Sequence, residues 1–256
     1  MKYFGIRRRL AARALGVVFL AMGSVIAQAQ EGGGWQCELT PYFTLAGING
    51  SVRPVGGKTI SISASPGDLL TNLDVGGSVA FEARHGRWGV VFDGIYMKLS
   101  KNVTLRDSLY SSVDVGVKSG ITSIEALYRA ADQKDLTVDV VGGVRFWATE
   151  TKLDYNEAQL PAKTVTNEKN WTDPVIGSRL KVGLADDLKF NALLDLGGFA
   201  VSSRFTYQVY LGAEYRFNDD LSGKFGYRLM GIDYDNEGYT NNLLIHGLTV
   251  GVTITF

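Results

Sequence analysis

The chain contains little cysteine, histidine and proline, and each shortage excludes a class of site. Its 256 residues include one cysteine, two histidines and five prolines. The single cysteine, Cys37, excludes an internal disulfide and a cysteine-based metal site. Neither histidine belongs to a recognisable metal-ligand spacing, so we expect no metal site and no cofactor. Scarce proline is compatible with many strands, because proline cannot donate a ladder hydrogen bond.

An excess of positive charge is also missing. The chain has 26 basic and 26 acidic side chains. Residues 1–29 hold five of the basic side chains and no acidic one, which leaves 21 against 26 in the remainder and a net charge of −5. A mildly acidic chain has no electrostatic basis for binding nucleic acid. We therefore expect no nucleic-acid partner.

No apolar run after the N-terminus is long enough for a spanning helix, which needs about 20 residues. At the N-terminus, residues 1–13 are basic, residues 14–27 are apolar, and Ala27-Gln28-Ala29 fits a small-x-small cleavage site. We interpret residues 1–29 as a secretory signal peptide, with Ala27 and Ala29 at the cleavage signal, and residues 30–256 as one domain. Such a domain can enter a membrane only as a closed barrel.

Alternation of apolar and polar residues is the main feature of this domain. The last stretch, Leu243–Phe256, places bulky apolar residues between small or hydroxylated ones, and 205–217 alternates even more regularly. Period-two alternation indicates strands with two unlike faces. About ten segments are long enough for a tilted spanning strand of ~9–11 residues. We predict an all-β fold, an antiparallel transmembrane β-barrel of about 10 strands, with 8 or 12 as alternatives.

The connections between these segments are short at one end and often long at the other. Tight turns are expected around Gly86, Gln133, Asp186 and Asp219, and long loops at 47–73, 101–112 and 154–172. Short periplasmic turns and long outer loops are typical of outer-membrane barrels.

Three local irregularities are also predicted. Ser65 and Pro66 mark the start of a short helix near 66–73, within a loop that has its own short strand over 58–64. Pro41 predicts a local break in the first strand. The alternation slips at Ser119-Gly120, which predicts a bulge there.

Charged side chains occupy the face opposite the apolar one. A basic residue facing lipid costs ~2–4 kcal/mol at the bilayer midplane, so in a membrane barrel these residues must face the lumen. Acids and bases are roughly balanced, and a barrel of about eight strands is just filled by its own side chains. We therefore expect an ion-paired lumen. The predicted network comprises Glu82, Arg84, Asp93, Glu125, Arg129, Asp139, Arg145, Arg179, Asp195, Glu214, Arg216 and Arg228.

The C-terminus resembles the targeting signal of bacterial outer-membrane barrels, through Thr249, Gly251, Ile254 and the terminal Phe256. Other segments resemble a family of small proteobacterial outer-membrane barrels of the OmpA/OmpW-like set. They are Leu39-Thr40-Pro41-Tyr42, Asp68-Leu69-Leu70 with Leu73, Phe81-Glu82-Ala83-Arg84 with Trp88, Gly143-Val144-Arg145-Phe146-Trp147 and Gly226-Tyr227-Arg228. The resemblance implies a bacterial outer-membrane location, with outer-membrane lipid and the barrel-assembly machinery as partners. We expect a monomer.

Three functional hypotheses follow. The first is a structural or surface-interaction role through the external loops at 47–73 and 154–172. The second is a narrow channel for small or apolar solutes, which measurable ion conductance or a lateral opening would distinguish. The third is an enzyme that modifies lipid A with His246 and a serine such as Ser202 or Ser203. No serine lies in strand register with His246, so we expect no enzymatic activity and name no catalytic residue.

Overall fold

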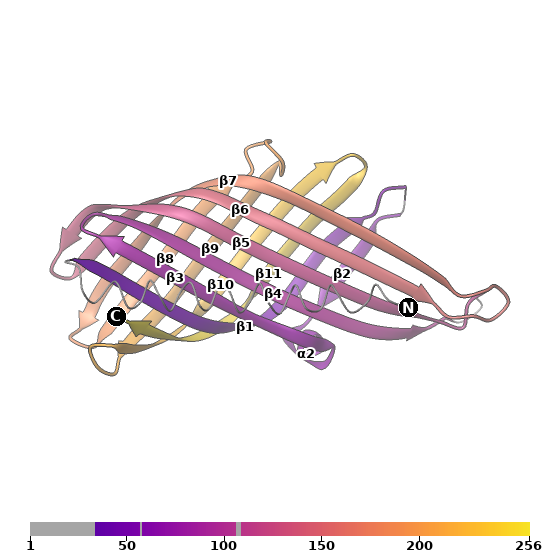
Figure 1. Cartoon of the computed structure of the whole chain (residues 1–256), viewed down its shortest axis with the longest axis horizontal. Coiled ribbons are helices and arrows are strands. Elements are labelled where there is room, and N and C mark those ends of the chain that lie inside the picture. Colours follow the sequence, from indigo (N-terminus) through magenta and orange to yellow (C-terminus); the bar gives the residue numbers. More distant parts are fainter. Residues whose placement is uncertain (1–33, 57, 106–108) are drawn as a thin grey trace, which may run out of the picture.

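The computed structural model describes residues 34–56, 58–105 and 109–256. Within them, ten antiparallel strands pair in chain order and the last pairs with the first, which closes a barrel (Figure 1). The predicted fold of about ten strands is confirmed. The ring consists of β1 (Trp35–Arg53), β3 (Leu73–His85), β4 (Trp88–Thr104), β5 (Ser112–Gln133), β6 (Leu136–Tyr155), β7 (Lys163–Ala185), β8 (Leu188–Gly197), β9 (Phe205–Arg216), β10 (Leu221–Asn236) and β11 (Tyr239–Thr255).

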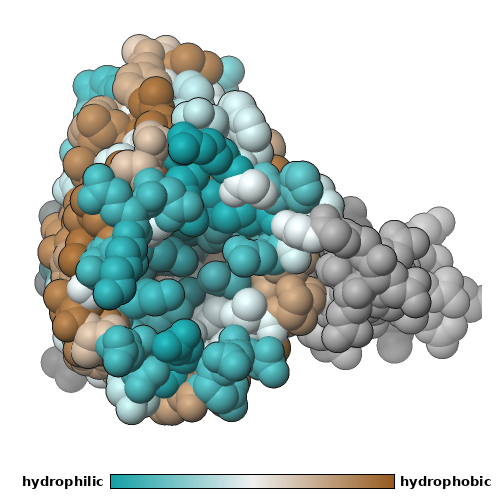
Figure 2. Space-filling view, turned by 90° about the vertical axis from the view of Figure 1, so that its left-hand side faces the viewer, coloured by the Kyte–Doolittle hydropathy of each residue, from teal (hydrophilic) through white to brown (hydrophobic). Residues whose placement is uncertain are grey.

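The two faces of the barrel wall differ as the alternation predicts. Along β11, Leu248, Val250, Val252 and Ile254 are exposed, whereas the intervening Thr249 and Thr253 are buried in the lumen. Figure 2 shows apolar residues along the side of the molecule and hydrophilic residues around a hollowed end. The outer surface can therefore contact hydrocarbon while the lumen holds polar groups.

The two ends of the barrel differ in the length of their connections. We call the end that holds the short β3–β4, β5–β6, β7–β8 and β9–β10 connections the turn end, and the opposite end the loop end. The first and last strands begin and end at the turn end (Figure 1). Strands β5, β6 and β7 are the longest, with 22, 20 and 23 residues, and they project beyond β8 and β9 at the loop end (Figure 1).

These long strands correct two predicted loops. The region 154–172 is mostly strand, because β6 continues to Tyr155 and β7 begins at Lys163; β4 likewise continues to Thr104 within the predicted loop 101–112. The alternation is lost there because both faces of a projecting strand contact water and both carry polar residues. Lys152 pairs with Asp154 at 2.6 Å on one such segment, and this hydrogen bond lowers the pKa of the Asp154 carboxyl.

The predicted loop 47–73 also contains more regular structure than expected. β1 continues to Arg53, and a short strand, β2 (Ile60–Ala64), folds back onto the loop-end half of β1. Helix α2 (Pro66–Thr71) follows, and it begins as predicted: Ser65 Oγ accepts a hydrogen bond from the Asp68 N–H at 3.2 Å, and the Ser65 N–H donates to Asp68 Oδ2 at 3.0 Å. In the described residues, no helix is long and apolar enough to cross a membrane.

The predicted irregularities are partly correct. Pairing of β1 with β11 is interrupted at Thr40 and Pro41, where proline lacks its donor. The predicted bulge at Ser119-Gly120 is wrong, because both residues pair continuously with β4 and β6. The register of β5 shifts instead next to the turn end, between Arg129 and Ala131. The alternation slips at 119–120 because the outward side of β5 becomes polar toward the loop end, where Lys118 pairs with Glu150 at 2.7 Å.

Two adjacent glycines of β6 test this packing. A methyl group at Gly143 would overlap the carbonyl oxygen of Ile124, whereas the nearest atom to a methyl at Gly142 is 3.9 Å away. Forcing a group into a packed site costs ~1–3 kcal/mol. We expect Gly143→Ala to lower the thermal unfolding midpoint in a heat-modifiable gel-mobility assay, and Gly142→Ala to leave it unchanged. Equal midpoints would contradict the close contact between β5 and β6.

Candidate functional site

The turn-end half of the lumen contains a dense ionic network. Asp139, which is almost fully buried, accepts hydrogen bonds from Arg84 at 2.9 Å, Arg129 at 3.0 Å and Arg179 at 2.7 Å. Arg179 also pairs with Glu82 at 2.6 Å. Three of these residues are neighbours in one row across β5, β6 and β7: Arg129, Asp139 and Arg179. Each charge has an opposite charge within contact, as a region of low dielectric requires.

A second ionic group lies deeper in the lumen. Arg145 is fully buried and donates two parallel hydrogen bonds to Asp195, at 3.0 and 2.9 Å. Arg145 Nε donates to Ser123 Oγ at 3.0 Å, and Glu125 lies 3.7 Å from the guanidinium. A bidentate arginine–carboxylate pair has fixed geometry as well as strength, so this pair joins β6 to β8 over the intervening strand β7.

A third group, near the turn end, is partly open to solvent. Lys224 lies 3.6 Å from Glu38 and 3.8 Å from Glu214, and Lys181 lies 4.0 Å from Glu38. Arg216, which we placed in the lumen network, is outside it. Its guanidinium contacts the Asp186 carbonyl at 2.8 Å and Asp187 at 3.3 Å, at the turn between β7 and β8. Alternation assigns Arg216 to the correct face of β9. Because β9 ends at this residue, its side chain reaches the neighbouring turn and not the lumen.

A fourth group joins three sides of the barrel at mid-height. Arg228 on β10 donates to Asp93 on β4 at 3.0 Å and to the Tyr42 hydroxyl on β1 at 2.8 Å. Its guanidinium carbon also lies 4.8 Å from the centre of the Tyr42 ring. The Tyr42 hydroxyl donates to the same Asp93 carboxylate. The predicted lumen network did not include Tyr42, although it alternates with Glu38 and Thr40 on the lumen face.

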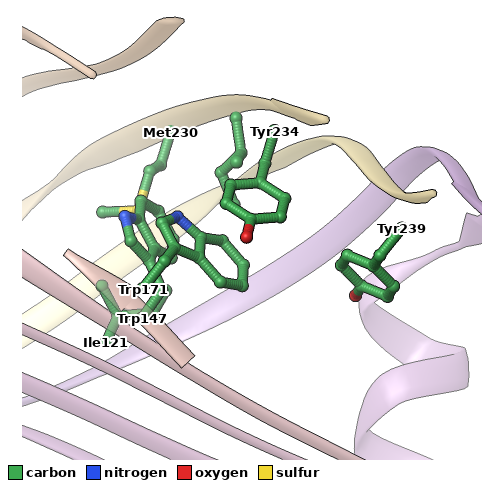
Figure 3. Close-up of a cluster of buried hydrophobic side chains, with 7 residues drawn as sticks. Ile121, Trp147, Trp171, Met230, Tyr234 and Tyr239 are labelled. Carbon is green, nitrogen blue, oxygen red and sulfur yellow. The ribbon is translucent and has the colours of Figure 1, made fainter. Parts of the chain in front are cut away.

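The loop-end half of the lumen is apolar. Ile121, Trp147 and Trp171 are neighbours in one row across β5, β6 and β7, and the Trp147 and Trp171 rings stack 5.8 Å apart. Opposite them stand residues from β10 and β11 (Figure 3). The cluster comprises Ile121, Trp147, Trp171, Met230, Ile232, Tyr234 and Tyr239. We call it the aromatic layer. Sequence reasoning missed Trp171, because it lay within the predicted loop 154–172.

Buried hydrogen bonds fix the edge of the aromatic layer. Asp173 and Ser203 have no exposed surface. Asp173 accepts hydrogen bonds from the Ser203 N–H at 2.7 Å, from its hydroxyl at 2.6 Å and from the Trp171 indole at 3.2 Å. The connection between β8 and β9 is thereby tied to β7.

The barrel wall is interrupted between β1 and β3. The last β1–β3 pair is Tyr42–Ser78, and the first β1–β2 pair is Ile48–Ala64. Within the described residues, no strand pairs with residues 43–47 of β1 on this side. Helix α2 lies at this gap, since Pro66 Cδ is 3.5 Å from the position that a methyl group at Gly47 would occupy. Adjacent glycines, Gly76 and Gly77, stand on the β3 side.

A pocket passes through this gap, with about 840 Å³ of empty space including the part open to solvent. Its lining includes residues whose side chains face outward, such as Phe43 and Tyr96, and residues of the aromatic layer, Ile121 and Met230. Helix α2 contributes Leu69 and Leu70 to the lining. Most of the other lining residues are also apolar. We call this space the lateral pocket.

A second cavity, of about 1,040 Å³ on the same measure, lies among the ionic groups of the turn-end half. Both signs of charge line it, including Glu38, Glu125, Lys181 and Lys224. We call it the polar cavity. Arg228 lines both the polar cavity and the lateral pocket.

The residues of the predicted C-terminal signal lie at the seam that closes the barrel. The hydroxyl groups of Thr249 and Thr44 form a hydrogen bond of 2.9 Å. Gly251 lies opposite Tyr42 in the β1–β11 ladder. Ile254 faces outward, and the Phe256 N–H donates to the Cys37 carbonyl at 3.0 Å. The predicted cleavage residues Ala27 and Ala29 lie outside the described residues.

His246 does not meet either candidate serine. Its Nδ1 lies 2.6 Å from the Tyr227 hydroxyl, and its Nε2 lies 3.0 Å from Asn49 Nδ2. The amide of Asn49 can only donate here, so Nε2 accepts and Nδ1 carries the proton. Ser203 is occupied by Asp173. In the part of the chain that the structure describes, no group of three His, Cys, Asp or Glu side chains is placed to hold a metal ion.

No family model and no curated protein sequence matches the chain. Solved structures do match it. The outer membrane protease OmpT from Escherichia coli gives a TM-score of 0.53 at 8% identity, over 88% of this chain and 97% of that chain.

Two further matches are more distant. The translocator domain of the autotransporter NalP from Neisseria meningitidis gives a TM-score of 0.40 at 13% identity, over 97% of this chain and 98% of that one. The transport unit of the autotransporter AIDA-I from Escherichia coli gives 0.40 at 6%, over 88% and 91%. The likeness to OmpT shows the barrel fold, and the resemblance to the OmpA/OmpW-like set stays a prediction.

The buried Arg145–Asp195 pair can be tested by unfolding in lipid vesicles. Removing one partner of a buried ion pair costs ~3–5 kcal/mol, whereas an apolar replacement of both can be neutral. We expect Arg145→Met to lower the free energy of unfolding by that amount, and Arg145→Met/Asp195→Leu to recover most of it. The control is Arg204→Ala, which removes an exposed pair with Asp233 and should cost ~0–1 kcal/mol. A double variant as unstable as the single one would contradict the pairing.

Proposed function

We propose that this chain is a bacterial outer-membrane β-barrel that binds small apolar solutes in the lateral pocket and admits them through its wall. Its turn end would face the periplasm. The outward apolar face, the N-terminal segment with the features of a signal peptide and the C-terminal strand support the location, and the fold shared with OmpT is compatible with it.

The observation that carries this proposal is the interruption between β1 and β3. Unpaired backbone at membrane depth is tolerated only where protein covers it or where it lines a water-filled cavity, and the start of α2 covers it at Gly47. Here it borders an apolar pocket that extends from outward-facing Phe43 to Met230 inside the barrel. Concave sites with a mostly apolar lining and few polar groups are typical of small-molecule binding.

The axial route through the barrel is less favourable. Paired charges surround the polar cavity in the turn-end half, and the aromatic layer occupies the loop-end half. A solute moving straight along the axis would have to displace the aromatic layer. A role through external loops would use the segments 47–73 and 154–172, and most of the latter is β-strand.

Entry through the wall can be measured by fluorescence quenching in lipid nanodiscs. The chain has four tryptophans, and Trp35→Phe/Trp88→Phe leaves Trp147 and Trp171 beside the lateral pocket as reporters. Bromobenzene, an apolar contact quencher, should quench them. Gly77 lines the pocket and has no atom within 4 Å of an added methyl group, so Gly77→Phe should fold normally and reduce the quenching.

The matched control for this experiment is Gly142→Phe, on an outward position of β6 that lines neither cavity. It should leave the quenching unchanged. The proposal fails if bromobenzene does not quench the two buried tryptophans, or if both phenylalanine variants reduce quenching equally.

Conductance tests the axial route separately. Because paired charges and the aromatic layer occupy the lumen, residues 30–256 inserted in a planar bilayer should show no steady single-channel openings. Insertion would be verified by protease protection of the same sample. Resolved openings of constant size would show that the lumen conducts, and the function would then be an axial channel.

A further inference from the structure

Three inward-facing residues of β10 follow the path from one cavity to the other. Lys224 lines the polar cavity, Met230 lines the lateral pocket, and Arg228 between them lines both. The two cavities are therefore adjacent, and the Arg228 side chain stands where they meet.

The contacts of Arg228 hold it across this boundary. Its two terminal nitrogens donate to Tyr42 and Asp93, both of which line the polar cavity. The guanidinium also covers the face of the Tyr42 ring. Its Nε is buried and has no hydrogen-bond partner in the described residues. The side chain is thus fixed at its tip only, by partners on β1 and β4 across the barrel.

The spaces on either side of Arg228 differ in polarity. On the turn-end side, Glu38, Lys181 and Lys224 retain about a fifth to a quarter of their side-chain exposure, and Figure 2 shows a hollow within the hydrophilic ring at this end. Water therefore reaches the polar cavity. On the other side, the lateral pocket is lined by Ile95, Met230 and other apolar residues and opens at the outer wall.

The geometry points to Arg228 as a gate between these two spaces, on a bent path that is lateral in the loop-end half and axial in the turn-end half. This inference rests on the proposed function for the role of the lateral pocket. When Arg228 is paired, it excludes water and ions from the apolar side. When its tip leaves Asp93 and Tyr42, the two cavities join. The solutes that can pass are small and uncharged, because an ion in the lateral pocket would lose its hydration.

Thiol labelling in lipid nanodiscs, which leave both barrel ends open to water, tests the gate. Replacing the only cysteine, Cys37→Ser, allows Met230→Cys to report on the lateral pocket. Neutral methyl methanethiosulfonate should label the new thiol. Anionic 2-sulfonatoethyl methanethiosulfonate should react more slowly by about tenfold or more, because a charge is excluded from an apolar space.

Removing the gate should abolish this difference. Arg228→Ala should raise the labelling rate of the anionic reagent to near that of the neutral one, measured by mass spectrometry. Arg228→Ala/Asp93→Asn is the second variant, because it leaves no unpaired buried carboxylate and so protects folding. Arg204→Ala, which removes an exposed cation that lines neither cavity, is the control and should leave both rates unchanged. Ile245→Cys provides a second reporter in the lateral pocket.

Two results would overturn the gate. One is rapid labelling by the anionic reagent while Arg228 is present. The other is continued exclusion of that reagent in both Arg228 variants with both reporters. Labelling from the aqueous side does not require bromobenzene to enter through the wall, so failure of the proposed function and failure of the gate give different results.

Discussion

Closure of the hydrogen-bonded ring is the constraint on which the rest of this structure depends. A strand in hydrocarbon has no water to satisfy its backbone, so it needs a partner on both sides. β11 meets β1 in one register from Glu38–Thr255 to Arg53–Thr240, which removes the open edge. Closure then places every second side chain in a narrow lumen. The size and polarity of these lumen side chains decide whether the barrel is filled or forms a pore.

The lumen is filled in two ways that suit its two halves. Near the turn end, charges are paired in contact, because an unpaired charge in low dielectric would cost several kcal/mol. Near the loop end, stacked aromatic rings fill the space without charge. Gly177 pairs with Asp195, and a methyl group at Gly177 would overlap the Asp195 Cβ, so the absence of a side chain there leaves room for the carboxylate that binds Arg145. The change of filling occurs at Arg228.

Sequence reasoning succeeded where one face of a strand contacts lipid. β9 was predicted almost residue for residue, because its outward positions are all apolar or aromatic. It failed over Lys163–Asn170, where both faces of β7 are polar and period two disappears. The lumen residues were found from their face alone, but their partners were not, since Arg145–Asp195 and Arg228–Tyr42 each join strands that are not direct neighbours in the ring. Arg216 shows the limit of the method. Alternation assigns it to the correct face, but its side chain contacts the turn at the end of the strand and not the lumen network.

The interruption between β1 and β3 could not be read from the sequence, and its cause is geometric. The β1–β3 register, continued past Tyr42–Ser78, would pair Phe43 with Gly77 and Gly47 with Leu73. The two unpaired segments are therefore equal in length, and no residue is missing. They stay apart because β2 takes up the pairing of β1 from Ile48 onward and the start of α2 lies against Gly47. Residues 60–71 therefore hold apart two segments that the β1–β3 register could pair. The space between them is the mostly apolar lateral pocket, and Arg228 lies at its inner end.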